Sequence, residues 1–141
     1  MTSGKKVASV TFFVICMLDL GHINGNLTAM NTNYYVLLIF APLLLLTGIL
    51  GFVIPREKGL ASGAPAYNIF HILFGLLGLG LVYSHIGVRL FNIGFGAIDL
   101  YQAVASFLHL FPEKQFQWKR ADDILHIVIG LALVLIGVFA P

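Results

Sequence analysis

Four apolar runs, each close to or at the length that spans a membrane, constrain this chain more than any other feature of its sequence. A transmembrane helix needs about 20 apolar residues to cross a hydrocarbon core of about 30 Å. The runs that approach or reach this length are Tyr34–Ile54, Tyr67–Gly87, Phe91–Phe111 and Ile124–Ala140. A shorter fifth run, Val7–Leu20, follows Lys5 and Lys6 and resembles either a signal-peptide core or a short or tilted span. The sequence therefore predicts an all-α, polytopic transmembrane helix bundle of about five helices.

The composition indicates which solvent and partners the chain has. Hydrophobic residues make up 59% of the 141 residues and charged residues 10%, whereas about a quarter of a soluble domain is charged. A formal net charge of +2 is too small to argue for nucleic acid. The single cysteine, Cys16, excludes an intramolecular disulfide and argues against a cysteine-based metal site. We therefore expect a lipid bilayer as the surroundings, and no nucleic-acid partner.

One stretch of the sequence occurs twice. Ala66–Leu76 returns as Ala121–Leu131, with Ala, Ile, His, Ile, Gly and Leu at the same offsets. The match continues into the preceding loops, so a helix, an inner loop and a second helix form a unit that repeats in the same orientation. The sequence thus predicts a parallel duplicated hairpin in three segments. They are a short span with an outer loop (1–33), a first hairpin (34–88) and a second hairpin (89–141).

The basic residues predict the orientation of the chain. If the N-terminus is cytoplasmic and Val7–Leu20 crosses, Arg89 is the one Lys or Arg residue outside, as the positive-inside rule favours. If this first run does not cross, Lys5 and Lys6 fall on the wrong side unless the run is cleaved. We expect a multi-pass cell-membrane protein with a cytoplasmic N-terminus. The membrane would be the bacterial inner membrane, or a thylakoid-type membrane in a photosynthetic organism.

Three histidines, His71, His109 and His126, lie within about one turn of the predicted inner surface. Neutral imidazole binds haem iron, chlorophyll magnesium and zinc. The glycine four residues after His71 and after His126 would let a flat macrocycle lie against the helix, so one hypothesis is a haem or chlorophyll held by these two residues, with His109 as a further ligand. The interpretation that we favour has the imidazoles bonded to loop carbonyls or lipid phosphates, with Gly75 and Gly130 allowing close helix packing. Zinc or another metal is a third alternative, and no dedicated metal site is predicted.

Asp99 is the ionisable residue that lies deepest in a predicted span. An ionisable group at mid-bilayer costs about 2.5 to 3.5 kcal/mol even on the mildest scale, so Asp99 must face the bundle interior. Gln102 follows it closely, and the two predict a mid-membrane polar site for a proton or a cation. The interpretation that we favour is a buried carboxyl that bonds to a neighbouring helix or reaches toward Arg89.

Aromatic residues gather near the predicted span ends. We expect them to form an interfacial belt that sets depth and tilt. Its members are Tyr34, Tyr35, Tyr67, Tyr83, Phe116 and Trp118.

Three short motifs carry a resemblance to a known family. They are Asn68-Ile-Phe-His71 with Gly75, Ala121-Asp-Asp-Ile-Leu-His126 with Gly130, and Gly48-Ile-Leu-Gly-Phe52. With these motifs, Tyr34–Phe139 resembles the small bacterial four-helix membrane family catalogued as domain of unknown function 4383. The resemblance implies a four-helix core in a bacterial membrane and no known activity.

Three classes of function are compatible with the sequence. Short loops and packing glycines favour a non-catalytic accessory or structural subunit that assembles with other membrane protein subunits. A tetrapyrrole carrier using the paired histidines is the first alternative, and a small transporter or channel using Asp99 is the second. An enzyme is not expected, because the sequence suggests no nucleophile, base and oxyanion donors that converge.

Overall fold

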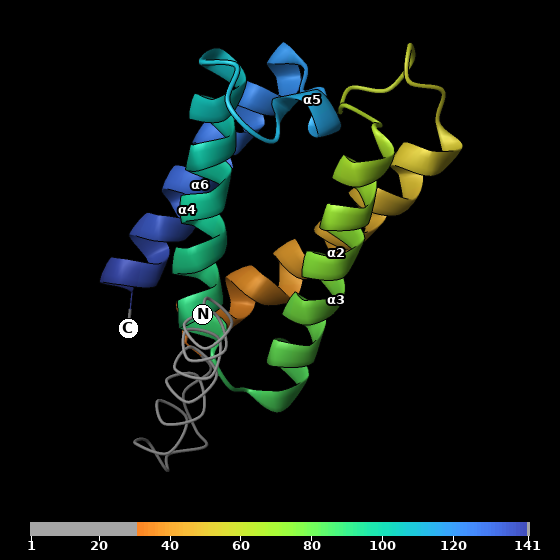
Figure 1. The fold of residues 1–141 in the computed structure, drawn as a ribbon. Coiled ribbons are helices and arrows are strands. Elements are labelled where there is room, and N and C mark those ends of the chain that lie inside the picture. Colours follow the sequence, from red (N-terminus) through yellow and green to blue (C-terminus); the bar gives the residue numbers. More distant parts are fainter. Residues whose placement is uncertain (1–30, 141) are drawn as a thin grey trace, which may run out of the picture.

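The computed structural model describes residues 31–140, which form four long helices and one short helix (Figure 1). The helices are α2 (Thr32–Val53), α3 (Pro65–Ser84), α4 (Val88–Phe107), α5 (Glu113–Phe116) and α6 (Arg120–Phe139). Residues 31–140 contain no strand. The prediction of an all-α helix bundle is confirmed. The predicted run Val7–Leu20 lies outside the described residues.

Three of the described helices, α2, α3 and α6, are long and apolar enough to cross a membrane. This supports a membrane protein, although the sequence predicts four spans in this region. α4 has the same length as α3 and α6, but Arg89, Asn92 and Asp99 make it less apolar. It also begins and ends earlier than the predicted run Phe91–Phe111.

The long helices pair as two antiparallel hairpins. α2 packs along α3, and α4 packs along α6. The connections inside the two hairpins, residues 54–64 and 108–119, lie at the same end of the molecule, and the α3–α4 turn lies at the other end (Figure 1). The two hairpins therefore run in the same direction through the bundle.

Local sequence signals explain where the helices begin. The Asn31 side chain accepts a hydrogen bond from a backbone N–H in the first turn of α2. Pro65 occupies the first turn of α3, where its missing N–H costs nothing. The Asp122 carboxylate accepts from the backbone N–H of Lys119 at the start of α6, over 2.8 Å. Between α3 and α4, Gly87 adopts the left-handed conformation, with φ of 69°.

Glycines bring the helices of each hairpin into close contact. A Cβ atom on Gly75 would lie 2.6 Å from the backbone nitrogen of Leu45 in α2. A Cβ atom on Gly130 would lie 2.8 Å from the backbone oxygen of Gly96 and 2.9 Å from Leu100, both in α4. Small residues at these points let the backbones approach, which is how membrane helices gain packing energy.

A phenylalanine cluster fills the centre between the hairpins. Neighbouring ring centroids lie 4.5–6.4 Å apart, a separation at which aromatic pairs attract one another. The members of the phenylalanine cluster are Phe40, Phe70, Phe74, Phe91 and Phe95.

Beyond the phenylalanine cluster, toward the α3–α4 turn, two asparagines join the hairpins. The Asn92 amide donates to the backbone and side-chain oxygens of Asn33 over 3.0 and 3.1 Å. The Asn33 amide donates to the carbonyl oxygen of Ala140 over 3.3 Å. This asparagine layer connects α2, α4 and the end of α6.

The glycine contact predicts unequal effects for two substitutions in α3. Gly75→Ala forces α2 and α3 apart, because its Cβ would meet the Leu45 backbone, and we expect a loss of about 1–3 kcal/mol in the free energy of unfolding. Gly80→Ala is the matched control, since no described neighbour lies within 4 Å of its Cβ and alanine raises helix propensity. Unfolding curves of both variants in mild detergent test this, and equal stabilities would contradict it.

Candidate functional site

Buried polar side chains from three helices meet at the α5 end of the bundle, and we call them the polar cluster. Two of these residues lie in the first two turns of α3, two lie in the middle of α4 and two lie in the first two turns of α6. The polar cluster consists of Tyr67, His71, Asp99, Gln102, Asp122 and His126, all of them buried.

A hydrogen bond between the hairpins organises this cluster. The Tyr67 hydroxyl donates to one carboxylate oxygen of Asp122 over 3.0 Å. The other oxygen of Asp122 accepts from the backbone N–H of Lys119. Tyr67 and Asp122 occupy the same position in the two copies of the repeated stretch. The first hairpin is therefore bonded to the second through matching positions.

The His71 imidazole is held by its own helix. Its Nδ1 atom lies 2.9 Å from the carbonyl oxygen of Tyr67, and a carbonyl oxygen only accepts, so we assign the proton to Nδ1. The Nε2 atom then carries the free lone pair. The Tyr67 ring lies 4.1 Å from the imidazole, centroid to centroid, and fixes its plane.

His126 is the least satisfied member of the polar cluster. The residue is 4% exposed, and neither ring nitrogen has a hydrogen-bond partner within residues 31–140. The rings of Tyr67 and Trp118 lie 6.2 and 6.4 Å from it. A buried polar group without a partner costs about 1–3 kcal/mol. His126 is therefore the position in this cluster where a hydrogen bond to a ligand or a proton donor would gain the most free energy.

Asp99 and Gln102 face the interior, as the sequence predicts. The Cβ atom of Asp99 lies against Gly130, one turn from His126 on α6. The Gln102 side-chain oxygen accepts from the Trp118 indole N–H over 3.2 Å, while its amide nitrogen has no partner in the described part of the chain. Both residues therefore join the two predicted histidines in one cluster.

The structure does not bring His109 to the other two histidines. His109 lies in the connection after α4, its side chain is 80% exposed, and it contacts Glu113 at 3.7 Å. α4 ends at Phe107, and His109 adopts a left-handed conformation with φ of 56° that turns the chain away. Among residues 31–140, no group of three or more His, Cys, Asp or Glu side chains is arranged to hold a metal ion.

Sequence reasoning missed three residues of this site. Tyr67 and Trp118 were expected in an interfacial aromatic belt, but Tyr67 is buried, and Tyr67 and Trp118 bond to α6 and α4, respectively. Asp122 was named only within the repeated stretch and was given no role of its own. The repeat aligns Tyr67 with Asp122, but the contact of these two positions between the hairpins comes from the structure.

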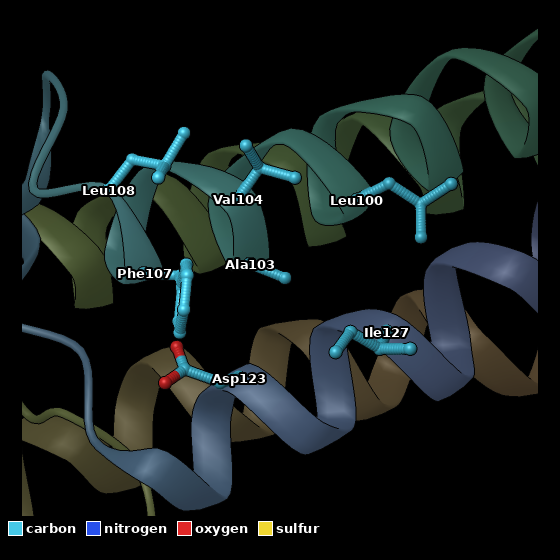
Figure 2. Close-up of a pocket in the computed structure, with 7 residues that line it drawn as sticks. All are labelled: Leu100, Ala103, Val104, Phe107, Leu108, Asp123 and Ile127. Atoms are coloured by element: carbon cyan, nitrogen blue, oxygen red, sulfur yellow. The ribbon is translucent and has the colours of Figure 1, made fainter.

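Two apolar grooves on the outer surface of the described helices are lined by no histidine. The larger one, of about 400 Å³, lies between α4 and α6 and carries Asp123 on its wall (Figure 2). The smaller one, of about 280 Å³, lies between α2 and α6. The spaces beside Gly75 and Gly130 are filled by Leu45 and by Asp99 with Leu100. Helix packing thus occupies the space that the tetrapyrrole hypothesis assigned to a macrocycle.

Comparison with known proteins gave no family model, no curated protein and no solved structure that matches this chain. The resemblance to domain of unknown function 4383 stays a prediction.

The Tyr67–Asp122 bond predicts a coupled loss of stability. Tyr67→Phe leaves a buried carboxylate oxygen without its donor, so we expect a loss of about 1–3 kcal/mol in the free energy of unfolding. Asp122→Asn should lower the free energy of unfolding less in the Tyr67→Phe background than in the wild type, because the two residues share one interaction. A double-mutant cycle in mild detergent measures this coupling. Tyr83→Phe is the control, since Tyr83 is 89% exposed, and additive losses would contradict the coupling.

Proposed function

We propose that this chain is a small multi-pass membrane protein that serves as a non-catalytic accessory or structural subunit of a larger membrane complex. The observation that carries this proposal is that side chains of the polar cluster form hydrogen bonds between separate elements of the bundle. Tyr67 bonds to Asp122 and Gln102 to Trp118 across elements of the bundle, and neither groove is lined by these four residues. Polar groups arranged in this way hold helices together.

The outer surface supports the same proposal. Apolar side chains are exposed on every long helix, among them Ile39 on α2, Leu73 on α3, Val104 on α4 and Ile124 on α6. In a bilayer, lipid or other membrane chains cover such faces. A subunit role uses part of this surface for partner helices and leaves the rest to lipid.

The phenylalanine cluster favours a structural role over transport through Asp99. On α4, Asn92, Phe95 and Asp99 follow one another along one face, so the ring of Phe95 separates the asparagine layer from the polar cluster. Phe95 is buried and packs against Phe74 and Phe40 from α3 and α2. A transport path through the bundle would need these rings to move.

For the orientation, we propose that the α5 end faces the cytoplasm. Lys119 bonds to the carbonyl oxygens of Arg56 and Gly59, and Arg56 bonds to Gln117 over 2.7 Å. These basic residues gather at the α5 end, whereas Arg89 bonds to carbonyl oxygens at the opposite end of α6. The positive-inside rule then favours a cytoplasmic α5 end in a bacterial inner membrane or a thylakoid-type membrane.

A tetrapyrrole carrier is the second candidate function. Two observations favour it: His126 is buried and has no hydrogen-bond partner among residues 31–140, and the Nδ1 bond of His71 leaves Nε2 free to ligate. His71 and His126 would then supply the two imidazoles to one haem or chlorophyll. Binding would require the packing around Gly75 and Gly130 to open.

Site-specific cross-linking tests the subunit role. A photoreactive residue is placed singly at Ile39, Leu73, Val104 and Ile124, one exposed position on each long helix. We expect one or two neighbouring helices to give an adduct with the same partner chain, because a partner covers only one side of the bundle. Lys58, in the exposed connection after α2, is the control position. Adducts that are absent, or equally distributed over abundant membrane proteins at all four positions, would contradict the proposal.

A visible absorption spectrum tests the second candidate. The protein is purified in mild detergent without added cofactor, and its oxidised and dithionite-reduced spectra are compared with those of the His71→Ala, His126→Ala double variant. A tetrapyrrole carrier shows a near-stoichiometric Soret band that the double variant loses. Under the subunit role, we expect no such band, and His109→Ala serves as the exposed control histidine.

A further inference from the structure

The groove between α2 and α6 is apolar and open to the outside. All of its lining side chains are apolar, and its volume is about 280 Å³. α2 and α6 belong to different hairpins and pack against each other over a short distance only. On the walls, Ile39, Leu43 and Val128 are 67%, 54% and 60% exposed. Within residues 31–140 nothing covers this face, so lipid or a further helix must cover it in a bilayer.

The shape of the groove suits a helix. Val128, Ala132 and Ile136 follow one another at spacings of four residues, so they form one ridge along the α6 wall. Ala132 is an exposed small residue in the middle of this ridge, and small residues let membrane helices approach closely. The α2 wall extends over Val36–Leu43, which is about 10 Å along the helix axis. A helix lying here would contact both walls over about two turns.

The groove lies beside the end of the bundle at which α2 begins. Val36 lines it only five residues after Asn31, where the described part of the chain starts. Between these two residues, Asn33 donates to the carbonyl oxygen of Ala140, so the start of α2 lies beside the end of α6. The groove between α4 and α6 extends instead toward Leu108, at the α5 end. The residues that precede Asn31 therefore join the bundle beside the α2–α6 groove.

The predicted run Val7–Leu20, which lies outside the described residues, has the composition and length that this groove requires. Eleven of its fourteen residues are apolar. A helix of this length measures about 21 Å, less than the hydrocarbon thickness of about 30 Å, and a span that is too short gains from association with other helices. The ten residues 21–30 connect it to α2. They reach up to about 35 Å, whereas packed helices lie about 8–10 Å apart.

The charges that precede the run indicate its direction. Lys5 and Lys6 come directly before Val7. If the run lies antiparallel to α2, these two lysines reach the α5 end, where Lys119 bonds to the backbone of Arg56. The positive-inside rule favours the basic residues on one side of the membrane, so it favours this direction.

We propose that the α2–α6 groove is the docking site of the chain's own segment Val7–Leu20, which packs there as a helix antiparallel to α2. A segment tethered by ten residues has a high effective concentration at the groove, which gives it an advantage over a separate protein chain. The inference is independent of the subunit role, and it leaves the outer faces of α3 and α4 to partner helices.

Intramolecular photo-cross-linking of the full chain in mild detergent tests the proposal. A photoreactive residue is placed singly at Leu43 or Ala132, one on each wall of the groove, and the adduct is located by mass spectrometry. We expect both positions to react with residues 7–20 of the same chain. Leu73, which is 60% exposed on α3 and lines neither groove, is the control position and should not reach them. Mixing isotope-labelled with unlabelled chains separates adducts within one chain from adducts with a second copy.

A pair of tryptophan variants tests the groove itself. Ala132→Trp fills the middle of the groove, so the adduct yield from Leu43 should fall about tenfold. Ala97→Trp is the matched control, since Ala97 is an exposed alanine of α4 that lines neither groove, and the yield should persist. The Leu43 adduct in the otherwise unchanged chain keeps the proposal testable if Ala132→Trp does not fold.

Four outcomes would overturn the proposal. Leu43 and Ala132 would react only with lipid, with a partner protein or with a second copy of the chain. Leu73 would react with residues 7–20 as efficiently as the two groove positions do. Ala132→Trp and Ala97→Trp would give equal adduct yields. The mass of the purified chain would show that residues 7–20 had been removed.

Discussion

Polar groups inside a membrane bundle must be satisfied by the protein itself, because the hydrocarbon offers no partner. In this chain that requirement joins the two hairpins. Tyr67 reaches Asp122 near the α5 end, and Asn92 reaches Asn33 at the other end. Few backbone contacts link the hairpins directly, since most helix packing occurs within each hairpin. The relative position of the hairpins therefore depends on these two polar layers, on the phenylalanine cluster between them and on the hydrogen bonds of Arg56 and Lys119 between the two connections at the α5 end.

This dependence explains why the polar cluster is best understood as part of the framework. Removing a partner from a buried hydrogen bond costs more than the bond contributes, so such groups specify one arrangement of helices. His126 departs from this rule, because its two ring nitrogens have no partner within residues 31–140. It is consequently the residue at which a function beyond assembly would first be sought.

The helices and their pairing were predictable, since apolar runs of membrane length and the repeat determine them. The ends of α4 were less predictable. The helix begins at Val88, so its first turn includes polar sequence that precedes the predicted apolar run. At the other end the chain turns at His109 instead of continuing to Phe111. The inward direction of Tyr67 was not predictable from periodicity. In a helix that is apolar on all sides, hydrophobic periodicity does not identify the face that packs. The inward direction of Tyr67 is shown only by its spatial contact with the matching position of the repeat, Asp122.

The Tyr67–Asp122 bond has a consequence for symmetry. Two identical hairpins related by a two-fold axis would set tyrosine opposite tyrosine, or aspartate opposite aspartate, at this point of the interface. Two carboxylates facing each other repel, and two hydroxyls give a weaker bond than a hydroxyl and a carboxylate. Carrying both hairpins on one chain allows a donor on one side and an acceptor on the other. Covalent fusion thus permits two unlike residues to meet at matching positions, where a two-fold homodimer of single hairpins would place identical residues.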